Sequence, residues 1–466
     1  MPKLKAELRK YLLGSVFVAS ALLGGGAAAG LWTDTLLQIF ILLCATPILA
    51  AREGEPIDNR ILWFCGAIMV ALLIQLVPLP AEVLRPFRSD LLLSGRQEFG
   101  GGGAEFISVG LGRTLEATLY VAVLIIFLLA LLRLPGEQLH ALLPFLLVGV
   151  ACNGIAALIQ YSASTRVTID DLMPFTIMAG FFANRNHFTS LLYTSLPFLL
   201  YLTTFAGARL WSSIAIAFLL LVLLAAGSRA GVLLGLAALV LSVVFFASRS
   251  RIGVWGVVLV AAVLGIYSMG TLALFETREL TDLTRAGFAS TTFNGIKDNW
   301  LFGIGYGNFP AAYQVYEDPE MVFHNYVNHA HNDFLEVIFE GGAAAVILLL
   351  AYLYLVLSQL VQVRHSHFHK AAFLGILFVL IHSVVDYPLR TMAVATAFIY
   401  FNAILFHRDL QPQGRHIKGF VDVHDGRRTR RFAITANPSD EAVTSESPRR
   451  LSSPSRRRVR QKERRS

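Results

Sequence analysis

The sequence predicts an all-α integral membrane protein. Hydrophobic residues make up 55% of its 466 residues and charged residues only 15%, which is far more apolar than an ordinary soluble domain. The apolar residues fall in runs of about 17 or more with almost no charge, the length that a helix needs to cross a hydrocarbon layer of about 30 Å. We therefore expect about twelve membrane-spanning helices.

The expected spans follow one another through mostly short connections. The basic segment MPKLKAELRK and the apolar run after it resemble a signal peptide. Because a second span follows directly, we expect the first to remain as a signal anchor. A long loop, 271–332, separates the ninth and tenth spans, and its many Phe, Trp, Tyr and Gly residues lead us to expect an ordered loop. The expected spans are 11–31, 34–50, 61–79, 115–133, 140–160, 187–206, 210–227, 231–248, 252–270, 333–361, 371–387 and 391–406.

The orientation follows from Lys and Arg in the short connections, which mark the cytoplasmic side. These residues gather near the N-terminus, in 51–60, 249–251 and 363–370, and in the tail. An even number of spans places all of these segments on one side. We therefore expect both termini in the cytoplasm and three longer segments on the outer side of the membrane: 80–114, 161–186 and 271–332.

The C-terminal tail, 407–466, carries most of the positive charge. It holds 16 Lys and Arg against 7 Asp and Glu, a net charge of +9, whereas the whole chain carries +8. The basic character therefore belongs to a tail behind a membrane domain, 1–406, and no nucleic-acid partner is indicated. The tail is rich in Arg, Ser and Pro, so we expect it to be disordered. It acts either as a solvated topology signal or as a contact for anionic membrane lipids.

The three cysteines lie inside expected spans, at Cys44, Cys65 and Cys152. Free cysteine packs as a small apolar residue. Their positions show neither a disulfide framework nor a metal-binding spacing.

The stretch NHAHNDFLEVIFEGG, from Asn328 to Gly342, is the most informative in the chain. Asp333, Glu336 and Glu340 follow His331 at helical spacings, so they share one face where the long loop enters the tenth span. Ionisable residues at such a depth are costly and usually functional.

This stretch has two other interpretations. Asn332 and Asp333 could cap the helix while the acids face water. His329 and His331 could bind zinc, but no matching third ligand is evident, so we expect no metal.

Two arginines stand out among those on the expected outer side. Arg229, in AGSRAG, falls between the seventh and eighth spans, and Arg285 begins the segment that ends in GIGYGNF. An arginine at an apolar boundary suits an anion such as a diphosphate. The alternative for Arg229 is snorkelling to the membrane surface or pairing with an acid.

A fourth polar block, FFANRNHFTSLL, stands just before the sixth span. Its polar cluster could contact substrate, or it could be an interfacial helix cap. The cluster consists of Asn184, Arg185, Asn186 and His187.

These four blocks, in this order, resemble the O-antigen ligase superfamily. That superfamily includes O-antigen ligases, Wzy-type polymerases of O-antigen and exopolysaccharide, and related protein O-oligosaccharyltransferases. The likeness covers Phe181 to Leu350, and the H-x-H-N block followed by an acid and glycine is its most specific part. The resemblance implies a GT-C-like helical bundle in a bacterial inner membrane, with the outer segments and the active site on the periplasmic side.

The resemblance also implies roles for particular residues. His331 would act as general base for the acceptor hydroxyl or orient it, and Arg229 and Arg285 would hold the diphosphate of the donor. The donor would be an undecaprenyl-diphosphate-linked oligosaccharide, and no metal, cofactor or nucleotide sugar would be needed. Further residues of the same blocks would contact substrate: Asn184, Arg185, Asn186, Asn308, His329, Asn332 and Glu336.

Three functions remain open at this point. A ligase would move a finished glycan onto lipid A–core, and a polymerase would move repeat units onto a growing glycan. We favour the ligase slightly. The third function, transport, fits the number of spans, but transporters usually show repeated halves and polar groups at the midplane, whereas the polar residues here gather at one face.

Overall fold

The computed structural model describes residues 2–28, 30–87, 104–162, 179–246, 280–317, 327–407, 417–425 and 428–435. The chain divides into two compact units, Met1–Leu410 and Gln411–Ser466.

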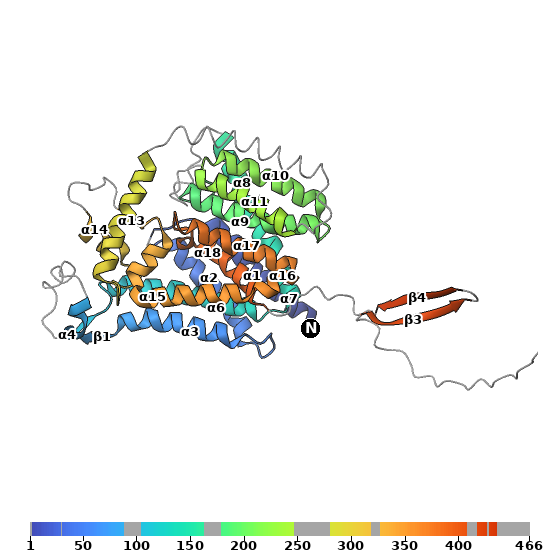
Figure 1. The fold of residues 1–466 in the computed structure, drawn as a ribbon, viewed down its shortest axis with the longest axis horizontal. Helices are drawn as coiled ribbons and strands as arrows, with labels where there is room; N and C mark the ends of the chain where they lie inside the picture. Colours follow the sequence, from blue (N-terminus) through green and yellow to red (C-terminus); the bar gives the residue numbers. More distant parts are fainter. Residues whose placement is uncertain are drawn as a thin grey trace, which may run out of the picture. The chain divides into compact units, whose positions relative to one another are not determined.

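Helices dominate the first unit (Figure 1). Two of the short 3-10 helices matter below. They are η1 (Ile74–Leu76), which directly follows the helix Asn59–Leu73, and η4 (Pro388–Arg390), which comes just before the helix Met392–Phe406. The α-helices are α1 (Pro2–Leu23), α2 (Trp32–Ala50), α3 (Asn59–Leu73), α4 (Ala81–Leu84), α6 (Leu111–Leu132), α7 (Gly136–His140), α8 (Leu143–Ser162), α9 (Arg185–Thr204), α10 (Arg209–Ala225), α11 (Arg229–Phe246), α13 (Leu280–Asp298), α14 (Phe309–Tyr316), α15 (Asp333–Ser358), α16 (Leu360–His365), α17 (His367–His382) and α18 (Met392–Phe406).

The membrane fold class is confirmed at the level of helix length and composition. Within the described residues, six helical stretches are long and apolar enough to cross a membrane, and three shorter helices are also apolar. Every expected span overlaps a helix except 252–270, which lies outside the described residues. The number of spans and the side on which each loop lies stay predictions. The six stretches are Trp32–Ala50, Asn59–Leu76, Leu111–Leu132, Gly136–Tyr161, Arg229–Phe246 and Asp333–His365.

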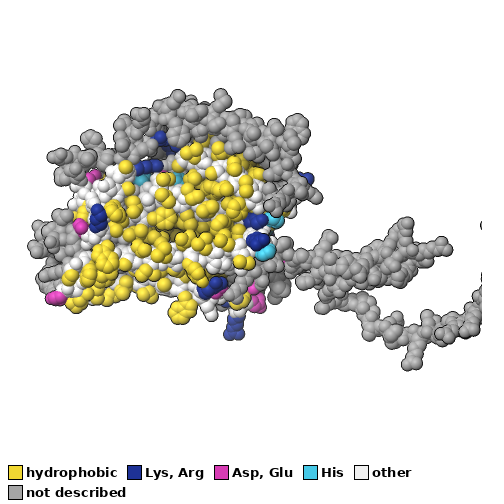
Figure 2. All heavy atoms as spheres, viewed as in Figure 1, with side chains coloured by type: hydrophobic (Ala, Val, Ile, Leu, Met, Phe, Trp, Pro, Cys, Tyr) yellow, Lys and Arg dark blue, Asp and Glu magenta, His cyan; other side chains and the backbone are white. Residues whose placement is uncertain are grey.

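The surface of the helical unit suits a lipid environment. Large apolar side chains are exposed on several helices, including Leu43, Trp63 and Trp211. Figure 2 shows hydrophobic side chains spread over the visible helical face, with charged side chains mainly at its margins. In water this much exposed apolar surface would be unfavourable, whereas hydrocarbon imposes no such cost.

Helix α9 lies among neighbours on several sides. It packs against α10, α11 and α17, and its residues from His187 to Leu199 are all buried. Its buried Ser and Thr hydroxyl groups are satisfied within the helix, as Thr194 Oγ1 and Ser195 Oγ donate to carbonyls one turn back, and its Tyr193 hydroxyl is hydrogen-bonded to His382 Nδ1 of α17. This packing fixes the polar first turn of α9 against the end of α17.

The long loop before α15 is ordered where the structure describes it. Helices α13 and α14 lie within it, and their apolar residues form a small core separate from the main one. The expected order of this loop therefore holds for 280–317 and 327–332. The small core consists of Phe288, Ile304, Phe309, Ala312, Tyr313, Val327, Ala330 and Phe339.

Helix α15 is broken at Gly342, whose φ of 58° and ψ of −142° are not helical. The segment 301–305 inserts at the break: Ala343 N donates to Leu301 O, and Gly305 N donates to Glu340 O. A Cβ on Gly342 would lie 2.5 Å from Leu301 O. The first turns of α15 are therefore held by the loop as well as by the rest of the helix.

Two short antiparallel sheets complete the described structure. In the first unit, β1 (Pro78–Pro80) pairs with β2 (Ala104–Phe106). In the second unit, β3 (Ile417–Asp425) pairs with β4 (Arg428–Thr435), with Val421 opposite Phe432. These two strands fall in the tail for which composition predicts disorder. Residues 436–466 lie outside the described residues.

Candidate active site

The first turns of α15 present three buried acids to one partner. Asp333, Glu336 and Glu340 are 5%, 1% and 0% exposed, so they do not face water. Asn332 does cap the helix, because its Oδ1 accepts from Leu335 N at 3.0 Å. The three acids therefore share one helix face, as their spacing in the sequence indicated. The capping interpretation holds for Asn332 alone.

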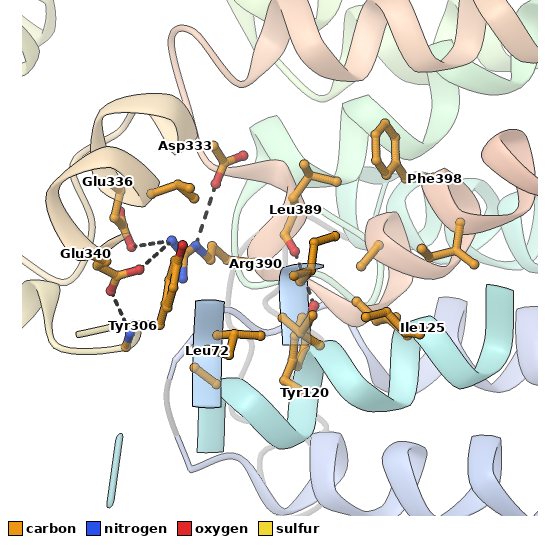
Figure 3. Close-up of a pocket in the computed structure, with 18 of the residues that line it drawn as sticks. Leu72, Tyr120, Ile125, Tyr306, Asp333, Glu336, Glu340, Leu389, Arg390 and Phe398 are labelled. Atoms are coloured by element: carbon orange, nitrogen blue, oxygen red, sulfur yellow. Dashed lines mark hydrogen bonds and ion pairs between the residues drawn. The ribbon is translucent and has the colours of Figure 1, made fainter. Parts of the chain in front are cut away.

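The partner of these acids is Arg390, at the end of η4. Its guanidinium lies 3.7 Å from Asp333 Oδ1, 3.2 Å from Glu336 Oε1 and 3.2 Å from Glu340 Oε2. Figure 3 shows the three carboxylates converging on it. A buried carboxylate is tolerable only when paired and hydrogen-bonded, so Arg390 is the group that allows this acidic face to be buried.

His329 forms a second ion pair with Glu336. Its Nδ1 lies 2.7 Å from Glu336 Oε1, and its Nε2 lies 3.0 Å from Ala27 O. Since both partners are acceptors, both ring nitrogens must donate, which requires the imidazolium form. Burial lowers the pKa of His329, but the Glu336 charge outweighs burial and raises that pKa above its ordinary value. His329 is therefore a charged member of this network.

A second network centres on Asp386, in the connection between α17 and η4. The carboxylate is fully buried and faces groups from several parts of the chain. His187 Nε2 and His331 Nδ1 lie 3.5 and 3.3 Å from Oδ1, and Arg285 Nη2 lies 3.5 Å from Oδ2. Asn186 Nδ2 donates to Oδ2 at 2.5 Å. Residues that sequence analysis selected from three separate blocks therefore meet at one carboxylate.

These neighbours decide the charge of Asp386. Burial raises the pKa of the carboxyl group, but the contacts with His187 and His331 outweigh burial and hold the pKa well below its ordinary value. Asp386 is therefore ionised at neutral pH, and it can stabilise a positive charge on the imidazole ring beside it.

The backbone and two aromatic rings position His331. It is the only non-glycine residue with a positive φ, 51°, among the residues that the structure describes. Its ring stacks on Phe288 at 5.6 Å and meets the edge of Tyr387 at 4.9 Å. Strained backbone of this kind persists where surrounding contacts hold it, and it is concentrated at functional sites. His331 Nδ1 has no aligned hydrogen-bond partner within the described part of the chain, as is common for catalytic groups without substrate.

Arg229 lies next to this network through its neighbour Ser228. The Ser228 hydroxyl donates to Asn186 Oδ1 at 2.8 Å, and Asn186 in turn contacts Asp386. Arg229 itself begins α11. Direct contacts thus link Ser228, Asn186, Asp386 and His331, so the AGSRAG and NHAHND blocks lie at the same end of the helical unit.

The other selected residues have more local contacts. Asn184 caps α9, since its Oδ1 accepts from Asn186 N, and Arg185 is the first residue of that helix. Asn308 is 1% exposed, and its Nδ2 donates to Ser108 Oγ and Thr114 Oγ1. These contacts give Asn184 and Asn308 structural roles, and their predicted contact with substrate stays a prediction.

The sequence analysis missed the segment HSVVDYPLR, from His382 to Arg390. It supplies Asp386, Arg390 and Tyr387, whose ring lies 4.6 Å from that of His187 and 4.3 Å from that of His329. A signal was available for Arg390, because it lies between the expected spans 371–387 and 391–406 on the expected outer side, whereas Asp386 falls inside the first of these spans. The reasoning that selected Arg229 applies equally to Arg390.

Comparison with known proteins supports the motif assignment. No curated protein matches the chain. Residues 214–350 match the sequence model of the family described as O-antigen ligase. The match includes Arg229, Arg285 and His331, and it ends where the motif likeness ends, whereas the block before the sixth span precedes it. The chain is thus a helical membrane protein whose residues 214–350 match the O-antigen ligase family, and this match supports the resemblance to the O-antigen ligase superfamily.

Proposed function

We propose that the protein moves an undecaprenyl-diphosphate-linked glycan onto an acceptor hydroxyl at the periplasmic side of the bacterial inner membrane. Membership of a family of ligase- and polymerase-type membrane enzymes supports a transfer of this class. The observation that carries the proposal is the convergence of His331, Arg285 and Asn186 on the buried Asp386 carboxylate. A base, a cation and an ionised orienting group thereby lie within one small region.

In the proposed reaction, the acceptor oxygen attacks the anomeric carbon of the donor sugar. A new glycosidic C–O bond forms, and the bond between the anomeric carbon and the diphosphate oxygen breaks. The hydroxyl proton passes to His331, and undecaprenyl diphosphate leaves with the bonding electrons. With Nδ1 directed at Asp386, Nε2 is the ring nitrogen that accepts this proton, and the carboxylate stabilises the resulting imidazolium.

Arg229 and Arg285 would bind the diphosphate. A guanidinium presents paired N–H donors that match phosphate oxygens, and it stabilises the negative charge that develops on the leaving group. Arg285 keeps a third of its side chain exposed while it approaches Asp386, so it can contact a ligand without losing its anchor. No metal ion is needed for this chemistry in the proposal.

The acceptor separates the two versions of this function. Lipid A–core as acceptor makes the protein a ligase, the version that we favour, and a growing glycan makes it a Wzy-type polymerase. Transport is the alternative of another class. It would require uptake of a solute by liposomes that contain the protein and no glycan donor.

The test is a transfer reaction with purified full-length protein. Undecaprenyl-diphosphate oligosaccharide is supplied with and without lipid A–core, and the products are separated by mass. We expect glycosylated lipid A–core from a ligase and longer lipid-linked glycans from a polymerase. His331→Ala and Arg285→Ala should each lower the transfer rate by about a hundredfold or more.

Matched controls separate chemistry from folding. His365→Ala and Arg209→Ala remove the same side-chain types at exposed sites on α16 and α10, and both variants should keep wild-type rates. If wild-type protein makes neither product, or if the site variants keep full activity, the proposed function is wrong.

A further inference from the structure

A long cavity lies on the other side of the segment that carries Asp386 and Arg390. Its volume is about 690 Å³, within the range of small-molecule sites. It runs along α6 from Arg113 to Leu128, which corresponds to about 22 Å at the rise of an α-helix. Its walls come from α2, α3, α6, α15 and α18. A cavity of this length fits a chain rather than a compact solute.

The cavity is apolar along most of its length and polar at one end. Leu72, Ile125 and Phe398 line the apolar part, and the Arg390 network closes the polar end (Figure 3). Helix α15 shows the same division, because its acidic first turns give way to Ala345, Leu348 and Leu349. One hydrocarbon tail with one polar head matches this pattern.

The charge at the polar end argues against an anionic head. Among the described lining residues, five carboxylates meet two arginines and His329, so acids exceed bases even with His329 charged. The two sides of the segment therefore differ in sign, with Arg229 and Arg285 on the other side. A diphosphate is disfavoured here and favoured there. The five acids are Asp34, Glu116, Asp333, Glu336 and Glu340, and the two arginines are Arg113 and Arg390.

Asp34 indicates which kind of polar group the head of the bound lipid carries. It lines the cavity from the first turn of α2, and its Oδ1 is buried with no hydrogen-bond partner among the residues that the structure describes. An unsatisfied buried carboxylate oxygen is costly, and a donor that reaches it restores the lost interaction. A hydroxyl group donates to a carboxylate, whereas a phosphate oxygen would repel it.

We propose that this cavity binds a lipid with an uncharged, polyhydroxylated head, with its chain between α6 and α18 and a head hydroxyl donating to Asp34. This inference goes beyond the proposed function, because the acceptors named there, lipid A–core and a diphosphate-linked glycan, carry phosphate groups that do not match such a head. Tyr387 connects the two sites: its ring lies 4.3 Å from His329, which lines the cavity, and 4.9 Å from His331.

The test measures binding and location without requiring transfer. Octadecyl β-glucoside bearing a photoreactive diazirine on its chain is added to the purified full-length protein, and the labelled peptides are identified. We expect saturable labelling of α6 and α18. Octadecyl glucoside should compete at least tenfold better than octadecyl phosphate, because only the phosphate is repelled by the excess of carboxylates.

Substitutions test the two halves of the site separately. Ile125→Trp should abolish labelling because the indole fills the cavity, whereas Leu115→Trp, on the exposed face of the same helix, should leave it unchanged. Asp34→Asn should weaken glucoside binding about tenfold, the effect of one lost hydrogen bond to a charged group.

Several results would overturn the inference: equal competition by the phosphate, labelling away from α6 and α18, or unchanged affinity of Asp34→Asn. The proposed function fails separately. Arg285→Ala should keep glucoside binding while losing transfer. If wild-type protein binds glucoside but transfers no glycan, the cavity assignment stands and the proposed function does not.

Discussion

The Asp386 carboxylate is the residue on which the candidate site depends. It contacts His187, His331, Arg285 and Asn186, which come from three separate parts of the chain. Removing its charge while keeping its shape isolates its electrostatic role. In Asp386→Asn the imidazolium formed at His331 would lose its counter-charge, so we expect glycan transfer to fall about a hundredfold to ten-thousandfold. Initial transfer rates of purified variant and wild type provide the measurement.

The same substitution has a pH signature. The pKa of Asp386 is lower in the folded protein than in an unfolded chain, so ionisation of this group stabilises the fold above the unfolded pKa. That contribution is lost as pH falls through the folded pKa. The melting temperature of the wild-type protein should therefore fall toward acid pH. In Asp386→Asn, the part of this fall that is due to Asp386 should be absent. Parallel melting curves for both proteins across acid pH would contradict the assignment.

At the scale of residues, the sequence identified several candidate side chains but not the Asp386 carboxylate that they all contact. His331 stood out because it lies just before the tenth expected span, and Arg285 stood out as a cation in the long outer loop. Asp386 did not stand out, because the expected span 371–387 includes it. Its importance arises from the packing of α17 against α9, a contact between helices far apart in the chain that no local pattern encodes.

Among the elements, the broken helix α15 makes the sharpest prediction. Gly342 adopts a backbone conformation that residues with a Cβ rarely adopt, and its place for a Cβ is occupied by Leu301 O. Gly342→Ala should therefore lower the stability by about 3 kcal/mol from strain and overpacking together. Thermal unfolding of purified protein in detergent gives the shift of the melting temperature.

Gly66→Ala is the matched control for Gly342. Gly66 lies in α3, and a Cβ there meets nothing within 4 Å. Alanine in place of glycine within a helix should stabilise by about 0.5–1 kcal/mol. If the two substitutions have the same effect, the strain assigned to Gly342 is absent.

Elements were predictable where apolar runs defined them. The expected spans 34–50 and 391–406 agree closely with α2 and α18, because length and hydropathy fix such helices. The first helix, α1, begins well before the expected 11–31, since its charged N-terminal turns carry no apolar signal. Helices α13 and α14 were expected only as an ordered loop, because tertiary contacts around Phe288 and Phe309 stabilise them.

For the whole molecule, the orientation in the membrane is the prediction that the fold leaves to experiment. The distribution of Lys and Arg places the loop with Trp300 in the periplasm and the connection with Glu53 in the cytoplasm. Both residues are exposed. In a chain without Cys44, Cys65 and Cys152, Trp300→Cys should react with a membrane-impermeant maleimide applied to cells with a permeabilised outer membrane.

Glu53→Cys is the opposite-side control for this labelling. It should react only after the inner membrane is also opened, because the reagent cannot cross it. Reaction of Glu53→Cys before Trp300→Cys would reverse the orientation and move the candidate site to the cytoplasmic face.

Composition alone predicted a membrane protein whose apolar helices lie in one unit, because a soluble fold could not bury so many apolar helices. Composition did not predict that this unit contains both a cationic site and a cavity with an acidic end. This arrangement depends on the side chains of Asp386 and Arg390, which face different neighbours although only three residues separate them.

The eight residues from Ser383 to Arg390 therefore lie between the two sites and contribute a charged residue to each. Both networks draw their central charge from this single connection between α17 and α18. Lengthening it by one residue would shift the register of both charges at once, so the two substrate positions cannot be altered independently through this segment.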